Sequence, residues 1–116
     1  MPVWKFDDPE PGDPPVRIGD WCAFRMPDGA RHVAGTGYMS YGREGRVTSA
    51  LRDEDDLATA TFVTSSGRRY QLVGRPGLSL DADYVLNRWL AIQGVERRHV
   101  VDVSKSLWND IQSGRR

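Results

Sequence analysis

The stretch of residues 58–73 constrains the fold more than any other part of the chain. Residues 58–64 and 68–73 are rich in β-branched side chains or alternate between polar and apolar ones, as strands do. The polar connection Ser65-Ser66-Gly67 ends on a glycine, which supplies the positive φ that a tight turn needs. The stretch therefore predicts a β-hairpin.

An earlier strand is predicted at residues 16–26, which hold a run of bulky apolar side chains. The pair Gly19-Asp20 interrupts this run and indicates a bulge or a turn. The sequence Pro27-Asp28-Gly29 is typical of a hairpin turn, so residues 31–34 are expected to return as the partner strand.

The segments between these two hairpins differ in character. Residues 45–51 are strand-like. Residues 35–42 contain three glycines and two tyrosines, and this composition predicts a loop. The acidic run at residues 53–56 is expected to form a solvated turn, because it lacks the ligand spacing of a calcium loop.

A helix is predicted at residues 82–93, after the last strand of the second hairpin. The apolar side chains at the spacing of one helix face are Ala82, Val85, Leu86, Trp89 and Leu90. Either Ser79 or Asp81 is expected to cap this helix, and Gly94 stands where a left-handed residue ends a helix.

The order of the elements predicts the fold class. A short strand at residues 99–103 and a last helix capped by Ser104 follow the first helix, so strands come first and helices last. This order favours an α+β domain, with a strongly bent antiparallel sheet or a small SH3-like barrel and one or two C-terminal helices.

A single domain is expected, because 116 residues suffice for one core. Residues 1–15 are expected to form an arm or an edge strand with a proline-rich acidic loop, residues 16–74 the β-rich core, and residues 81–114 the helical part. With no signal-peptide pattern, no apolar run of about 20 residues and one cysteine, the expectation is a cytoplasmic protein that does not enter a membrane.

Catalytic groups are sparse in the sequence. The single cysteine, Cys22, stands among apolar residues, and the only histidines, His32 and His99, belong to no recognisable motif. A zinc site needs several cysteines and histidines at paired spacings. The prediction is therefore a protein that is not an enzyme, with no metal site and no cofactor.

The charges favour two candidate binding surfaces. Sixteen basic and sixteen acidic residues cancel, so the chain has no net charge to attract DNA. The first candidate surface interleaves tyrosines and arginines: Tyr38, Tyr41, Arg43, Arg46, Arg68, Arg69 and Arg75. The second is the acidic run Asp53, Glu54, Asp55 and Asp56. Alternatively, Tyr70 alternates inward with Leu72 while the arginines only solubilise an outer face.

Residues 45–74 resemble a pattern found in short proteins of phages, prophages and other mobile elements, in which a Thr-Ser strand is followed by Thr-x-Ser-Gly-x-x-Tyr-x-Leu. The matching residues are Thr48, Ser49, Thr64, Ser66, Gly67, Tyr70 and Leu72. Separately, residues 16–21 look like the opening strand of SH3-like barrels. The first resemblance covers about a quarter of the chain and implies an accessory protein of a mobile element, without implying any catalytic or binding residue.

These observations lead to two functional hypotheses. The first is a non-catalytic binding protein of a phage or mobile element that inhibits or modulates a host factor, for example in bacterial immunity, with a protein as its partner. The alternative is a small β-barrel protein that binds nucleic acid, a nucleotide or another phosphorylated ligand.

Overall fold

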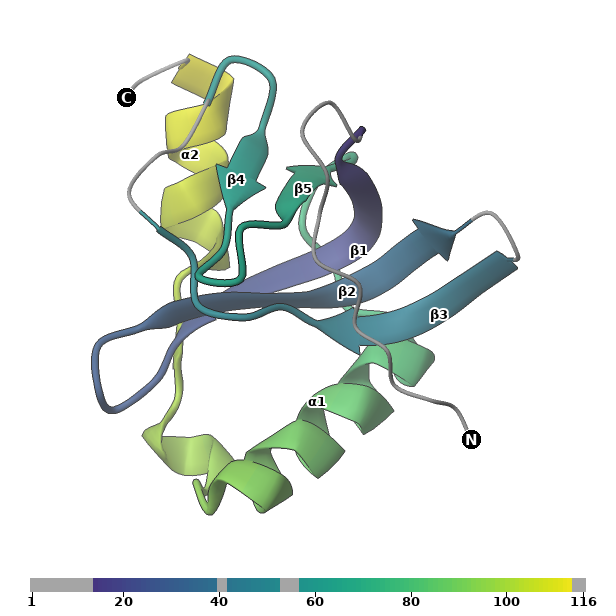
Figure 1. Cartoon of the computed structure of the whole chain (residues 1–116). Coiled ribbons are helices and arrows are strands. Elements are labelled where there is room, and N and C mark those ends of the chain that lie inside the picture. Colours follow the sequence, from purple (N-terminus) through teal and green to yellow (C-terminus); the bar gives the residue numbers. More distant parts are fainter. Residues whose placement is uncertain (1–13, 40–41, 53–56, 114–116) are drawn as a thin grey trace.

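The computed structural model describes residues 14–39, 42–52 and 57–113, and it confirms the α+β class (Figure 1). The strands are β1 (Val16–Arg25), β2 (Arg31–Met39), β3 (Gly42–Val47), β4 (Thr61–Val63), β5 (Arg69–Leu72) and β6 (Val101–Asp102). The helices are α1 (Leu80–Gln93) and α2 (Ser104–Ser113), with a 3₁₀ turn at Arg97–His99 between them. In this part of the chain the strands form one sheet in the order β3-β2-β1-β5-β4, and β6 also pairs with β1.

Strand β1 is the centre of the sheet, and both of its edges are paired. One edge pairs with β2 through the predicted hairpin turn. The other edge pairs in parallel with β5 through Val16–Ile18 and antiparallel with β6 at Phe24 and Arg25. The sheet is therefore mixed rather than purely antiparallel, and it does not close into the SH3-like barrel that was the other expectation.

The predicted interruption at Gly19-Asp20 is a β-bulge. The register between β1 and β2 shifts between Gly19 and Cys22, and Asp20 has a φ of 45°. Side chains alternate along a regular strand, so Ile18 and Trp21 would otherwise point to opposite faces. The extra residue places both in the same buried cluster.

The two faces of the sheet carry separate apolar clusters. On one face, Ile18, Trp21 and Phe62 pack together, and α2 contributes Leu107 and the ring of Trp108, which lies 6.4 Å from that of Trp21. The residues of the other cluster, to which α1 contributes, are Phe24, Met26, Ala34, Leu86 and Leu90. Figure 1 shows α1 and α2 on opposite sides of the sheet.

The loop predicted at residues 35–42 is wrong, because β2 extends to Met39 and β3 begins at Gly42. The glycines serve close packing within the strands. A Cβ on Gly35 would lie 2.5 Å from Cγ2 of Ile18, and one on Gly45 would lie 2.7 Å from the carbonyl oxygen of Asp81 in α1. Only glycine permits such an approach, although its frequency in turns made the segment look like a loop.

The ends of α1 follow the predicted chemistry. The helix begins at Leu80, two residues earlier than expected, and the Ser79 hydroxyl accepts a hydrogen bond from the Ala82 backbone N–H. Gly94 ends the helix with a φ of 72°. Trp89, predicted on the buried stripe, is half-buried, and its ring meets that of Phe24 edge-on at 5.9 Å.

The beginning of α2 differs from the prediction. Ser104 is the first residue of the helix rather than its cap, and its buried hydroxyl accepts from the Ala23 N–H and donates to the Ala23 carbonyl. The Asp102 carboxylate accepts from the Ser104 N–H instead. Strand β6 is also shorter than the predicted strand at residues 99–103. The hydroxyl of Ser104 thus ties α2 to β1.

The close approach of β3 and α1 gives a stability prediction. Gly45→Ala places a methyl group 2.7 Å from backbone oxygen and 3.0 Å from Cγ2 of Val85, so the helix must shift. We expect a loss of about 1–3 kcal/mol in the free energy of unfolding, measured by urea denaturation. The control is Gly77→Ala, whose methyl group would meet nothing closer than 3.6 Å. Equal stability of the two variants would contradict this account of the strand glycines.

Candidate binding surface

The strand register brings an aromatic and a guanidinium group together on one sheet face. Arg17 of β1 lies opposite Tyr38 of β2 and Gln71 of β5. Directly opposed residues project from the same face, and Arg69 joins them because it lies two residues before Gln71. We call Arg17, Tyr38, Arg69 and Gln71 the sheet-face surface. Arg17 and Arg69 are exposed, and 40% of the Tyr38 side chain is exposed.

The backbone of β1 at Gly19 supports the ring of Tyr38. The Tyr38 ring packs over Gly19, where an added Cβ would lie 2.6 Å from the phenolic oxygen. Gln71 donates from Nε2 to the carbonyl of Thr59 at 3.1 Å. Among the residues that the structure describes, the guanidinium of Arg17 forms no ion pair or side-chain hydrogen bond. The ring is therefore fixed beside a cation whose donors are available.

Arg46 and Tyr70 lie on the other face of the sheet. Tyr70 is buried in the cluster with Ile18, as its alternation with Leu72 predicts. Arg46 donates to Glu44 at 2.9 Å and to the Tyr70 hydroxyl at 3.4 Å. Burial alone would lower the pKa of Arg46, but these contacts with Glu44 and Tyr70 raise it above its usual value. Arg46 is engaged within the fold and is separated from Tyr38 by the sheet.

The remaining predicted site residues are dispersed. Arg68 lies half-buried next to the β4–β5 turn, and Arg75 is exposed in the connection between β5 and α1. The backbone of Arg43 pairs with Tyr38 across β3. Tyr41 and the acidic run, Asp53 to Asp56, fall outside the described residues. The structure therefore brings together Tyr38 and Arg69 from the predicted set and adds Arg17 and Gln71.

The sequence alone indicates only some of the residues of the sheet-face surface. The β1–β2 hairpin turn is local and was recognised, but its strands were expected to end before Tyr38. The pairing of Arg17 with Gln71 is parallel and joins residues more than fifty positions apart. Parallel strands are joined by long crossover connections, so no pattern of neighbouring residues predicts which two strands will pair.

Of the side chains with catalytic chemistry, His32 and Cys22 are used for packing, and His99 is exposed in the 3₁₀ turn. His32 is buried, its ring stacks on Phe24 and lies 4.9 Å from the ring of Trp89, and its Nδ1 is 3.0 Å from the Thr48 carbonyl. Burial, and secondarily the negative charge of Asp102, raise the pKa of the Cys22 thiol. Both effects disfavour a thiolate nucleophile at neutral pH. In residues 14–39, 42–52 and 57–113, no three His, Cys, Asp or Glu side chains gather as metal ligands would.

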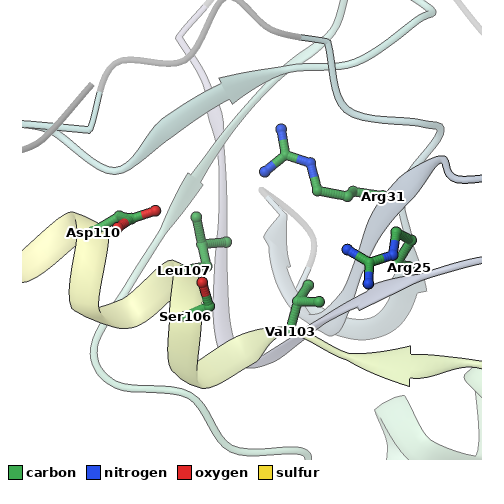
Figure 2. Close-up of a pocket in the computed structure, with 6 residues that line it drawn as sticks. All are labelled: Arg25, Arg31, Val103, Ser106, Leu107 and Asp110. Carbon is green, nitrogen blue, oxygen red and sulfur yellow. The ribbon is translucent and has the colours of Figure 1, made fainter.

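A hollow of about 220 Å³ lies between the β1–β2 hairpin and α2 (Figure 2). Its lining residues are Arg25, Arg31, Val103, Ser106, Leu107 and Asp110. Figure 2 shows Arg31 and Asp110 reaching in from opposite walls. Two arginines and one aspartate are the charged groups of this lining.

No model of a protein family, no curated protein and no solved structure matches the chain. Within the described residues, no helix is both long and apolar enough to cross a membrane. The side-chain chemistry of the exposed surfaces is therefore the guide to function.

The buried thiol predicts a pH dependence of stability. A raised pKa means that the folded chain holds the Cys22 proton more tightly than the unfolded chain does. This contribution to stability is complete below the pKa of the unfolded thiol, near 8.5, and is lost as the pH rises above it. Urea denaturation at pH 7 and pH 10 should show a larger loss for the parent chain than for Cys22→Ala. Parallel losses in the two proteins would contradict the prediction.

Proposed function

We propose that this chain is a non-catalytic binding protein whose sheet-face surface contacts a protein partner. The observation that carries the proposal is the exposed Tyr38 ring, which packs on the backbone of β1 beside Arg17, a guanidinium with no ion pair among the described residues. Tyrosine and arginine are the residue types that dominate the energetic centres of protein interfaces. Strands hold the backbone of these residues more rigidly than loops do, so less backbone entropy is lost on binding.

A protein fits this surface better than bulk nucleic acid does. The chain has no net charge, so it lacks the general field that drives nonspecific binding to DNA. Arg17 provides a local positive charge that complements an acidic group on a partner. A protein that acts by covering such a patch requires shape and charge but no catalytic group.

We further propose that the protein is an accessory protein of a phage or another mobile element that inhibits or modulates a host factor, with an anti-defence role included. Support comes from the resemblance of residues 45–74. Three of its matching residues have structural roles: Thr48 is buried and its hydroxyl accepts from the Val33 N–H, while the Thr64 hydroxyl lies 2.9 Å from that of Ser66. These residues therefore stabilise the fold rather than form a binding site.

A second candidate function is binding of single-stranded nucleic acid or a phosphorylated ligand. It is favoured by the same juxtaposition, since the Tyr38 ring can stack on a base while Arg17 pairs with a phosphate. Titration of labelled single-stranded DNA, RNA and duplex DNA at low and moderate salt tests it. Salt-sensitive binding that Tyr38→Ala abolishes would support this candidate, and no binding at low salt would exclude it.

The binding proposal predicts which variants lose the partner. The tagged chain is used to capture a stoichiometric protein from a lysate of its host, and the dissociation constant is then measured with the purified partner. Arg17→Glu and Tyr38→Ala should each weaken binding by about tenfold or more, because both remove central contacts while leaving folding intact.

Lys105→Glu is the matched control, because Lys105 is exposed on α2, away from the sheet-face surface. Its affinity should equal that of the parent chain. Unchanged affinity of both sheet-face variants would move the binding site elsewhere, and failure to find any stoichiometric protein partner would refute the proposed function itself.

A further inference from the structure

The outer face of α1 carries large apolar side chains where a surface helix is expected to be polar. Leu80, Tyr84 and Ile92 expose 88%, 61% and 75% of their side chains. At about 100° per residue they span an arc of roughly 120° on the side of α1 away from the buried Leu86 and Leu90. Large apolar side chains this exposed favour a partner that covers them.

Two opposite charges lie near Tyr84 on this outer face, one before it and one after it along the helix. Asp81 and Arg88 are exposed, and neither forms an ion pair among the described residues. Arg88 donates to the Tyr84 hydroxyl at 3.2 Å and lies over its ring. Seven residues separate the two charges, which is roughly 10 Å along a helix, so Asp81 and Arg88 are too far apart to pair with each other.

We propose that the partner of this face is a second copy of the chain, docked through an antiparallel pair of α1 helices. At about 100° per residue, Asp81 and Arg88 lie on the same flank of Tyr84, roughly 60° and 40° around the helix. A two-fold axis perpendicular to the helices keeps each residue on its flank and reverses its position along the helix. Each Asp81 therefore meets Arg88 of the other copy, and the two pairs form together.

The same axis also brings Leu80 and Tyr84 into the contact, whereas Ile92 lies beyond the stretch over which the two helices face each other. The axis passes close to Tyr84, so the two Tyr84 rings meet, and it places Leu80 opposite the small, exposed Ala91 of the other copy. In a parallel pair, the two-fold axis runs along the helices and exchanges their two sides. Asp81 would then lie opposite Leu80 of the other copy. Charge complementarity thus selects the antiparallel dimer.

One exposed helix face is smaller than the area of about 800 Å² per partner that stable complexes bury. The dimer should therefore be weak, with a dissociation constant on the order of tens of micromolar. At such concentrations a dimer presents two sheet-face surfaces to a repetitive target, which raises its avidity.

Sedimentation equilibrium of the full chain, from about 1 µM to 1 mM, tests the proposal. The parent chain should pass from monomer to dimer over this range. Asp81→Arg and Arg88→Asp should each raise the dissociation constant by on the order of tenfold, because two attractive pairs become two repulsive ones. The double variant Asp81→Arg with Arg88→Asp exchanges the charges and should restore the parental value.

Lys105→Glu again serves as the control and should leave the dissociation constant unchanged. Ala91→Glu, which places a carboxylate against Leu80 of the other copy at the end of the contact, provides a second disruption that leaves the Asp81–Arg88 pairs in place. Circular dichroism verifies that each variant is folded. A parent chain that stays monomeric at 1 mM, or a double variant as weak as the single ones, would overturn the proposal. Either result leaves the proposed function standing, since partner binding is measured separately.

Discussion

The pairing of both edges of strand β1 is the constraint on which the rest of this structure depends. Its two edges pair with β2 on one side and with β5 and β6 on the other. The side chains on its two faces belong to separate apolar clusters. The bulge at Gly19-Asp20 makes this possible, because it brings Trp21 to the face of Ile18 while Phe24 serves the opposite face. Trp21 also donates from its indole nitrogen to the Gly74 carbonyl at 3.0 Å, which fixes the chain as it leaves β5.

This arrangement determines which surfaces are left for binding. Helix α1 covers β2 and β3 on one side of the sheet, and α2 packs against β1 on the other. Tyr38 and Arg17 remain exposed near the end of the sheet where α1 begins, since Thr36, two residues before Tyr38, already contacts Ser79 at the helix N-terminus. An exposed face that combines an aromatic ring with a guanidinium group is suited to recognising another macromolecule.

Local chemistry predicted the elements of this fold better than their assembly. The hairpin around Gly67, the Ser79 cap, the Gly94 terminus and the bulge each depend on a few neighbouring residues, and all are present. The glycines of β2 and β3 were misleading, because the packing partners that require them, Ile18 and Asp81, are distant in sequence. For the same reason, the sequence indicated Tyr38 and Arg69 but missed Arg17, whose pairing with β5 is nonlocal.

Native-state hydrogen exchange, followed residue by residue, tests the role of β1 most directly. If β1 holds both clusters together, the amides of Trp21, Ala23 and Phe24 should exchange only when the whole chain unfolds. Their free energies of exchange would then equal the free energy of unfolding from urea denaturation, while β3 and β4 at the sheet edges exchange at lower values. Exchange of the β1 amides by local opening, at free energies below those of β3, would contradict this account.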